Sequence, residues 1–323
     1  MAQNAYRVRN WRQYNEALVQ RGSITFWFSE EVIANWHVND VRNVRGRPKK
    51  YSDVAIKCGL TLKAVFNLTF RAAEGFVRSL IDRMQIKAEA PDYSLLCKRQ
   101  KGLNVSLPKG RVDQKEGIHI VVDSTGLKVF GEGEWKVRQH GYVKRRVWRK
   151  LHLAVNTANQ EIEAFALTEL ELQDGEGLLL LAKEIDTEID RITGDGAYDQ
   201  YKDYQLAEAR DCKLIVPPRR DAKLTKECTG FSTLQKHTPE MLEALKSRDG
   251  FIERIRQIGR TEWKKEIGYH QRSLVETAMF RIKTLLGNRL RTRTFEHQKV
   301  EAAIWCNIIN QMTRLGMPIS KAV

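Results

Sequence analysis

Residues 117–130, GIHIVVDSTGLKVF, hold the pattern that decides the fold. The run GIHIVVD is apolar and rich in β-branched residues, which predicts a buried strand ending in Asp123. Ser124-Thr125-Gly126 then predicts a turn before LKVF. Downstream, LHLAVN at 151–156 and EIEAFAL at 161–167 have the same character and are separated by a turn. The three segments predict an antiparallel meander.

The segments after the meander alternate between helical and extended patterns. EGLLLLAKEI at 176–185 predicts a helix, DRITGD a short strand ending in Asp195, residues 199–210 a helix, and CKLIVP a last strand. The order βββαβαβ predicts a mixed α/β layer. Residues 219–265 form a polar insertion with a helix expected after Thr238-Pro239. Two final helices are expected, one over 269–283 and one around 300–314.

The N-terminal third has a different character. Residues 1–50 form a basic arm, whose Arg45-Gly46-Arg47-Pro48 resembles the core of AT-hook peptides or serves as a basic linker. Residues 51–110 are expected to form a helical domain with its linker, with one helix from Ser52 to Gly59 and a longer one from Thr61. The short helix that follows carries three cations. They are Lys98, Arg99 and Lys101. This pattern predicts a helix-turn-helix DNA-binding unit, with a plain helical bundle as the alternative.

Charge and composition define the class of partner. The net charge is +15, and residues 1–110 carry 19 Lys and Arg against 9 Asp and Glu. A basic front end predicts binding to double-stranded DNA, because cationic side chains release counterions from nucleic acid. No apolar run approaches the length of a membrane span, so no membrane partner is expected. Five scattered cysteines without a CxxC pair predict a reducing compartment, hence a cytoplasmic protein.

Acidic and basic residues at fixed positions predict a catalytic site. Asp123 and Asp195 end two expected strands and would converge if those strands are neighbours, which calls for a counter-cation such as Mg²⁺. In YHQRSLVETAMFRIK, the steps between Tyr269, Arg272, Glu276 and Lys283 are three, four and seven residues. That spacing places the four on one helix face. A solvated, salt-bridged helix face is the alternative interpretation.

Together these motifs resemble bacterial insertion-sequence transposases with a ribonuclease-H-like DDE core. The resemblance rests on DSTGLKVFG, GDGAYD and Tyr-x2-Arg-x3-Glu-x6-Lys, the YREK signature, with 71 and 80 residues between successive acids. It is nearest to the insertion sequence five group and its 903-type relatives. It implies that Asp123, Asp195 and Glu276 bind two Mg²⁺ ions, which Mn²⁺ can replace. It also implies that Tyr269, Arg272 and Lys283 hold transposon-end phosphates.

The resemblance extends to further DNA contacts and to assembly. In related transposases an aromatic side chain stacks on a flipped base, which makes Trp135 or Trp148 a candidate, with core packing as the favoured alternative for Trp148. Lys136 and Arg138 lie in the same basic stretch. A homodimer would synapse two element ends, and the bacterial protein would be associated with the nucleoid.

The remaining acids are expected to be structural. Asp199 is interpreted as a helix N-cap. The acidic segment 158–203 is interpreted as the face away from DNA, apart from Asp195.

We therefore expect a ribonuclease-H-like catalytic domain over residues 111–323, preceded by an all-α helix-turn-helix-type region. The expected function is DNA transposition by two-metal phosphoryl transfer. Two other functions fit the residues less completely. One is a DNA-binding repressor without chemistry, and the other is a structure-selective nuclease of the same fold. Metal-dependent nicking and the joining of a pre-cleaved end distinguish the three.

Overall fold

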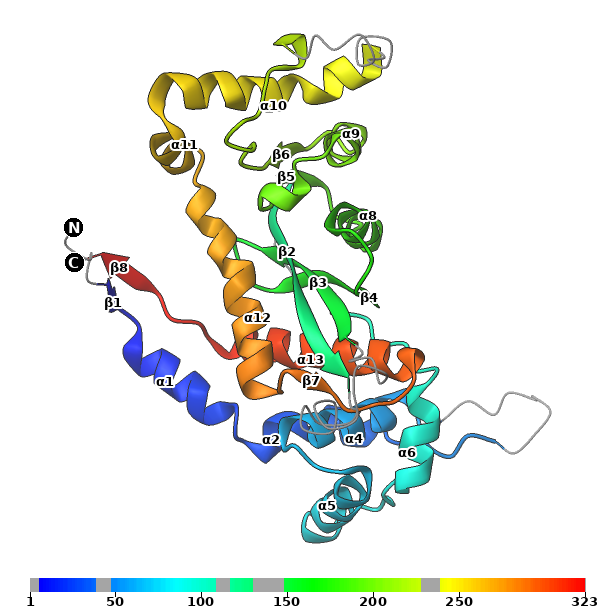
Figure 1. Ribbon diagram of the computed structural model, residues 1–323. Coiled ribbons are helices and arrows are strands. Elements are labelled where there is room, and N and C mark those ends of the chain that lie inside the picture. The colour runs from blue at the N-terminus through cyan, green and yellow to red at the C-terminus, as the bar shows by residue number, and fades with distance from the viewer. Residues whose placement is uncertain (1–5, 39–47, 109–116, 130–147, 228–238, 323) are drawn as a thin grey trace, which may run out of the picture. The chain divides into compact units, whose positions relative to one another are not determined.

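The computed structural model describes residues 6–38, 48–108, 117–129, 148–227 and 239–322 (Figure 1). Contacts divide the chain into two compact units. The terminal unit comprises residues 1–106 and 284–323, and the central unit comprises residues 107–283. Residues 284–323, which the sequence analysis included in the catalytic domain, lie in the same compact unit as the N-terminal helices.

The central unit is built on a mixed sheet in the order β4-β3-β2-β5-β6 (Figure 1). Its strands are β2 (Ile118–Val129), β3 (Trp148–Asn156), β4 (Ile162–Glu169), β5 (Ile189–Thr193) and β6 (Lys213–Ile215). Strands β2, β3 and β4 pair antiparallel, whereas β5 pairs parallel with both β2 and β6. With α8 (Asp174–Glu184) and α9 (Tyr201–Ala209) between strands, the predicted order βββαβαβ is confirmed.

The turn predicted at Ser124-Thr125-Gly126 is wrong, because β2 continues through these residues. Thr125 pairs with Leu151 and Gly126 with Lys150 of β3. Gly126 lies beneath the ring of Trp148, where an added Cβ would lie 3.2 Å from Cε3. The glycine is therefore explained by close packing inside the sheet, and long-range strand pairing overrides the local turn signal.

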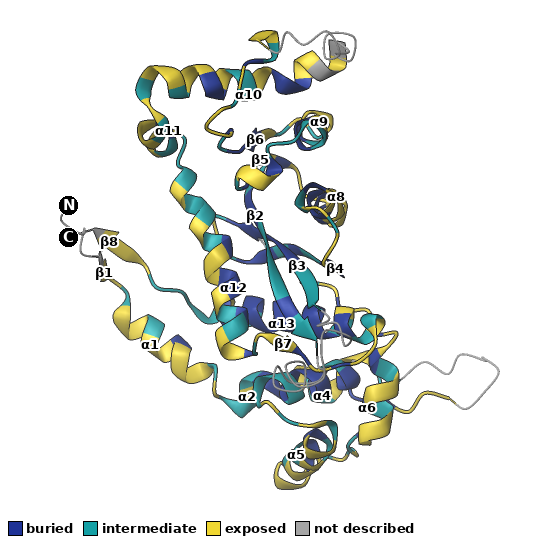
Figure 2. Cartoon of the chain, in the orientation of Figure 1, coloured by how far each residue is buried: buried dark blue, intermediate teal, exposed yellow. Residues whose placement is uncertain are grey.

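Helices α8 and α9 cover one face of the sheet. Alternate residues Ile118, Ile120 and Val122 of β2 belong to the same buried cluster as residues Leu178 of α8 and Tyr204 of α9. Figure 2 shows the strands of this sheet largely buried, with exposed residues on the outer sides of the helices. This cluster forms the main core of the central unit and fixes the position of β2.

Beyond β6 the chain forms the elements that lead to the last motif. They are η2 (Thr225–Glu227), α10 (Pro239–Ile258), α11 (Arg260–Glu266), η4 (Tyr269–Arg272) and α12 (Ser273–Leu285). The helix expected after Thr238-Pro239 is confirmed as α10. The buried ring of Trp263 packs on Phe251 with ring centroids 5.3 Å apart, which anchors α11 to α10.

The terminal unit is mainly helical. Its elements are α1 (Trp11–Gln20), α2 (Ile24–Trp27), α3 (Glu30–Ala34), α4 (Asp53–Val65), α5 (Phe70–Arg83), α6 (Tyr93–Gln100), β7 (Arg289–Leu290) and α13 (Phe295–Leu315). The short strands β1 (Tyr6–Val8) and β8 (Ser320–Ala322) pair antiparallel, so the unit is not purely α. Helix α13 is buried around most of its circumference and forms the centre of the unit.

Helix α4 does not end at Gly59, as the sequence had predicted. It begins after Ser52, whose Oγ accepts a hydrogen bond from Ala55 N at 3.1 Å, and continues to Val65. An added Cβ at Gly59 would lie 2.9 Å from Leu96 Cδ2 of α6. The glycine permits close helix packing, and the next helix, α5, begins after the cap residue Thr69.

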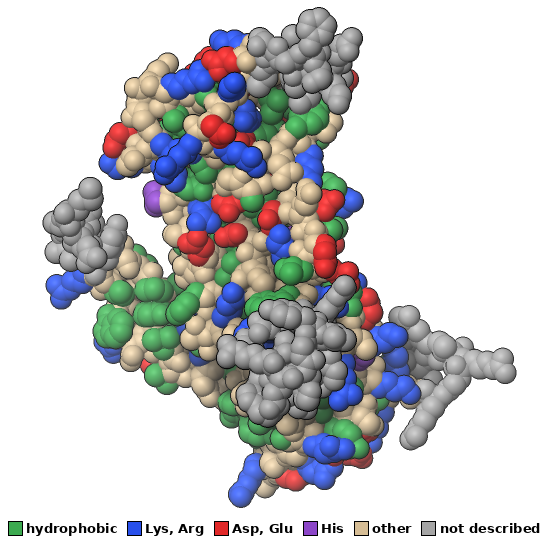
Figure 3. Space-filling model, viewed as in Figure 1, with side chains coloured by type: hydrophobic (Ala, Val, Ile, Leu, Met, Phe, Trp, Pro, Cys, Tyr) green, Lys and Arg blue, Asp and Glu red, His purple; other side chains and the backbone are tan. Residues whose placement is uncertain are grey.

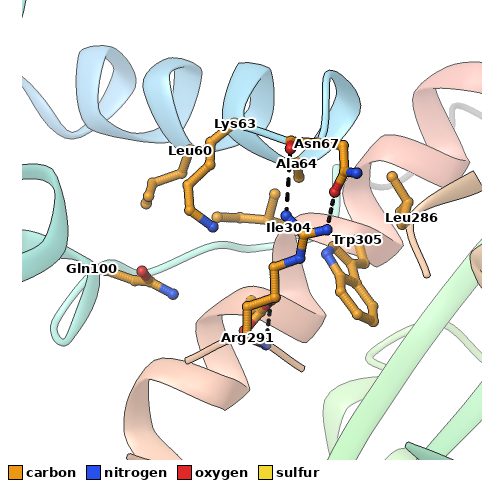
Figure 4. A pocket seen from close by; sticks show the side chains of 10 residues that line it. Leu60, Lys63, Ala64, Asn67, Gln100, Leu286, Arg291, Ile304 and Trp305 are labelled. Carbon is orange, nitrogen blue, oxygen red and sulfur yellow. Dashed lines mark hydrogen bonds between the residues drawn. The ribbon is translucent and has the colours of Figure 1, made fainter. Parts of the chain in front are cut away.

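A small cavity of about 20 Å³ lies inside the terminal unit (Figure 4). Lys63, Gln100 and Arg291 are among its lining residues, and burial lowers the pKa of Lys63. The Gln100 Oε1 atom is buried and lacks a hydrogen-bond partner. A space of this size and polarity accommodates a single water molecule. Within the described ranges, no helix has both the length and the apolar character of a membrane span.

Candidate active site

Asp123 lies within β2, on the face opposite to the one that α8 covers. Successive strand residues point to opposite faces, so Asp123 and Thr125 share one face and Ser124 takes the other. The Asp123 Oδ1 atom accepts a hydrogen bond from Ser124 N at 2.7 Å, and Oδ2 accepts one from Arg272 Nη1 at 3.1 Å. Both oxygens of this carboxylate are therefore held.

Asp195 follows β5, which is the parallel neighbour of β2. Its Oδ1 atom accepts a hydrogen bond from Ala197 N at 2.9 Å, which caps the short turn η1 (Gly196–Tyr198). The preceding Gly194 has no room for a side chain, because a Cβ would lie 2.7 Å from Tyr198 Cδ2. The convergence predicted for the two strands thus arises from the β2–β5 pairing, with Asp123 just beyond the paired segment.

The predicted helix face is divided between two elements. Tyr269 and Arg272 lie in the 3-10 turn η4, whereas Glu276 and Lys283 lie on α12. Gly268, at φ +67°, separates this turn from α11 and requires a left-handed backbone that favours glycine. The prediction of one continuous α-helix from Tyr269 was therefore wrong, because residues 269–272 form a 3-10 turn and the α-helix begins at Ser273.

The motif side chains contact the central sheet at three points. Arg272 donates hydrogen bonds to both Asp123 and Glu276. The Tyr269 hydroxyl donates to Gly194 O at 3.1 Å, beside Asp195, and Lys283 Nζ donates to Thr125 Oγ1 at 2.5 Å. Figure 3 shows acidic and basic side chains interleaved over the region of β2 and α12. The structure thus brings these predicted residues onto one face of the sheet.

The electrostatics of the site reflect crowded carboxylates. Burial raises the pKa of Asp123, the hydrogen bond from Ser124 lowers it, and the negative charges of Asp195 and Glu276 raise it further. The positive charge of Arg272 offsets part of that effect. Burial, together with these acids, raises the pKa of Tyr269 to about 12, so its hydroxyl remains a donor at neutral pH.

The donor set has the chemistry of a divalent-metal site. Three mutually repelling carboxylates require positive charge, and carboxylate oxygens are the ligands that hard cations prefer. Arg272 supplies that charge in the present arrangement. With its guanidinium between Asp123 and Glu276, no three metal-ligating side chains of the described part of the chain form a ready metal cluster. Asp123, Asp195 and Glu276 have the oxygen donors that a divalent metal ion prefers. Arg272 occupies the space between Asp123 and Glu276.

The other predicted contacts are distributed unevenly. Lys98 and Lys101 are exposed in and just after α6. Arg99 donates to Tyr51 O and to Asp53, which fixes α6 against the start of α4. Trp148 is half-buried in β3. The predicted contacts Arg45, Arg47, Trp135, Lys136 and Arg138 lie outside the described residues.

Sequence reasoning missed the partners of two acids. Asp174, within the segment interpreted as facing away from DNA, accepts a hydrogen bond from Ser124 Oγ at 2.6 Å, next to Asp123. Asp199 is not a helix N-cap; its side chain is 2% exposed and accepts a hydrogen bond from Arg248 Nε at 2.8 Å. Both pairs join residues about 50 positions apart, and no local pattern marks them.

Comparison with known proteins identifies the family. A family model described as "Transposase DDE domain" matches residues 114–311, which is more than half of the chain, and a second model of the same description matches residues 19–132. A similar solved structure is the cryo-EM structure of the piggyBac transposase synaptic complex with hairpin DNA. The two sequences are 11% identical over 91% of this chain and 73% of that chain, with a TM-score of 0.38. DDE transposases use divalent metal ions. Since the family model covers more than half of the chain and spans Asp123, Asp195 and Glu276, this chain belongs to the DDE transposases, enzymes that carry out DNA transposition.

Proposed function

We propose that this transposase binds the inverted-repeat ends of an insertion sequence, cleaves there to free 3′-hydroxyl groups, and transfers them to target DNA. The supporting observation is that Arg272 joins Asp123 and Glu276 on the sheet face where Asp195 also raises the pKa of Asp123. An acidic site that already contains an arginine, whose guanidinium can bind phosphate oxygens, suits phosphodiester chemistry.

The proposed reaction consists of two in-line displacements at phosphorus. In cleavage, a water oxygen forms a bond to phosphorus and loses a proton to solvent, while the 3′-oxygen leaves with the electron pair and gains a proton. In strand transfer, the freed 3′-hydroxyl attacks a target phosphorus, and the target's own 3′-oxygen leaves in the same way. Two divalent ions, Mg²⁺ or Mn²⁺, held by Asp123, Asp195 and Glu276, would activate the nucleophile and neutralise the leaving oxygen.

The neighbouring side chains would hold the DNA end. The Arg272 guanidinium, now shared by two carboxylates, has the fork geometry that binds two phosphate oxygens. Lys283 would add a point charge about two turns beyond Glu276 along α12. Tyr269 keeps η4, which carries Arg272, attached to Gly194 beside Asp195. Loss of Arg272 or Lys283 would chiefly misplace the DNA end.

The terminal unit would supply sequence recognition. Its residues carry 24 Lys and Arg against 11 Asp and Glu, a net charge of +13, whereas the central unit carries 31 against 29, a net charge of +2. We propose a helix-turn-helix-type contact through α4 to α6, with Lys98 and Lys101 at phosphates. Membership of the insertion sequence five group, a homodimer in the synaptic complex and a bacterial nucleoid location complete the proposal.

The three carboxylates provide the direct test. Asp123→Asn, Asp195→Asn and Glu276→Gln keep the side-chain shapes but remove the charges, so nicking of labelled end DNA in Mg²⁺ or Mn²⁺ should fall to background. Binding of the same DNA should persist. Glu184→Gln, at the exposed end of α8, is the matched control and should nick normally.

Each rival function has its own outcome in this assay. Normal nicking by any of the three carboxylate variants would refute the assignment. A wild-type protein that binds ends but never nicks them would be a repressor. Nicking without the joining of a pre-cleaved end would indicate a nuclease of the same fold.

A further inference from the structure

A polar network lies behind Asp123, on the opposite face of β2. Ser124 uses its backbone N–H to hold Asp123 Oδ1 at 2.7 Å and its hydroxyl to bind Asp174 Oδ1 at 2.6 Å. One residue therefore joins a site carboxylate on one face of the sheet to an acid on the other. Asp174 is the first residue of α8, where the helix dipole favours negative charge.

Asp174 is itself held from a second direction. Lys150 Nζ of β3 lies 2.9 Å from Asp174 Oδ1 and donates to Leu172 O at 3.2 Å. Burial raises the pKa of Asp174, but hydrogen bonds from Ser124 and Lys150 outweigh it and keep the pKa below its usual value. The acceptor is therefore charged at neutral pH, and charge-assisted hydrogen bonds are the stronger kind.

The start of α8 is shaped to bring Asp174 close to the sheet. Two glycines, Gly175 and Gly177, follow Asp174, although glycine is unfavourable inside a helix. An added Cβ at Gly177 would lie 2.2 Å from Nδ1 of the fully buried His152. At Gly175 it would lie 2.5 Å from Asp203 Oδ1. The glycines thus allow the helix N-terminus to lie directly on β3 and α9.

We propose that Asp174 is a positioning residue that acts through Ser124 to fix Asp123 for divalent-metal binding; this inference rests on the proposed function. Asp123 lies among like charges. When Arg272 binds a phosphate instead of Asp123, the hydrogen bond from Ser124 N still holds the Asp123 carboxylate. Partners that orient a metal ligand from behind commonly contribute about 10- to 100-fold to metal affinity. The Asp174–Ser124 pair lies behind Asp123 in this way.

Mn²⁺ binding to the DNA-free protein tests the proposal directly. Isothermal titration should show that Ser124→Ala and Asp174→Ala weaken Mn²⁺ binding by about tenfold. Asp174→Asn, which keeps an oxygen acceptor, should be closer to wild type. The matched control Glu184→Gln removes a carboxylate from the other end of α8 and should bind Mn²⁺ normally.

A strand-nicking titration separates positioning from a purely structural role. For a positioning residue, the Mn²⁺ concentration for half-maximal nicking rises about tenfold, and saturating Mn²⁺ restores most of the wild-type rate. A structural role would lower the melting temperature and leave the Mn²⁺ requirement unchanged. If Asp174→Ala fails to fold, Ser124→Ala decides, since it removes a single hydroxyl.

Failure of this inference differs from failure of the proposed function. Mn²⁺ affinity within twofold of wild type in both Ser124→Ala and Asp174→Ala, while Asp123→Asn loses binding, would overturn the positioning role alone. Unchanged nicking by Asp123→Asn would instead overturn the assignment of the site.

Discussion

At the scale of single residues, the buried His152 shows how the surroundings of a side chain shift its pKa. Its Nε2 atom lies 3.0 Å from Thr168 Oγ1, whose proton is directed to Glu169 O at 3.0 Å. The Nδ1 atom makes no hydrogen bond, although it lies 4.0 Å from Asp174 Oδ1. Burial, followed by the charge of Lys150, lowers the pKa of His152 to about 4, while Asp174 opposes the shift.

This histidine makes stability depend on pH. Between about pH 4 and pH 6.5 the unfolded chain binds a proton at this position that the folded chain does not, so stability falls as the pH falls. From pH 7.5 to pH 5 the free energy of unfolding of wild type should drop by about 2 kcal/mol more than that of His152→Leu. Urea unfolding at the two pH values measures this difference, because His119 and the carboxylates distant from His152 are common to both proteins, and Asp174, whose pKa is lowered, stays charged over this range. An equal drop in both proteins would show that His152 does not titrate as described.

Residue types in the site could be predicted from the sequence, but their contacts could not. Asp123 and Asp195 stand out because each comes directly after an apolar, β-rich segment. Glu276 stands out because it belongs to the spaced Tyr-Arg-Glu-Lys motif. The bond between Ser124 and Asp174 spans 50 positions and depends on the register of β2 against β3 and on the docking of α8. Arg272 between two acids likewise depends on how η4 meets β2.

At the scale of elements, glycines decide how closely helices approach their neighbours. Gly177 of α8 lies against the His152 ring, whereas Gly250 of α10 has nothing within 4 Å of an added Cβ. The two positions share a helical backbone and differ only in their surroundings. They form a matched pair within the central unit.

Alanine at these two glycines should have opposite effects. Gly177→Ala forces the buried imidazole to move and should lower the free energy of unfolding by about 1–3 kcal/mol. Gly250→Ala should raise it by about 0.5–1 kcal/mol, because alanine favours the helix. Thermal or urea unfolding of both variants provides the comparison. Stabilisation by Gly177→Ala would contradict the close approach of α8 to β3.

Elements were easier to predict than their limits. The meander and the order of strands and helices follow from hydrophobic periodicity, and the helix at Pro239 follows from the preference of proline for the first helical turn. Two of the errors occurred at glycines. Gly59 and Gly126 were interpreted as signals for a helix end and a turn, but both lie under a neighbouring side chain, Leu96 and Trp148 respectively. A glycine needed for packing and one needed for a turn look the same in a single sequence.

At the scale of the whole molecule, the terminal and central units differ in net charge as well as in secondary structure. The terminal unit carries a net charge of +13 and the central unit +2. The sequence predicted a basic front end but could not assign residues 284–323 to it. That assignment depends on the burial of α13 among the N-terminal helices, which is a tertiary property.

DNA binding should therefore depend on salt mainly through the terminal unit. The logarithm of the binding constant should fall linearly with the logarithm of salt concentration, by about 0.9 per phosphate neutralised. Lys98→Ala and Lys101→Ala should each reduce this slope by about 1. Lys183→Ala, an exposed lysine of α8 in the central unit, is the control and should leave the slope unchanged. Fluorescence anisotropy with end DNA at several salt concentrations measures all four proteins, and equal slopes would exclude α6 as a phosphate contact.

The terminal unit is assembled from both ends of the chain, and this has a consequence during synthesis. On a ribosome that adds about 5–20 residues per second, the segment from 107 to 283 emerges before α13 does. The N-terminal helices must therefore wait about 10–40 s for the helix that completes their core. A nascent or prematurely terminated chain carries the strands and carboxylates of the central unit without a finished terminal unit. If that unit recognises DNA as proposed, recognition is acquired last, and only by chains that have been translated through α13.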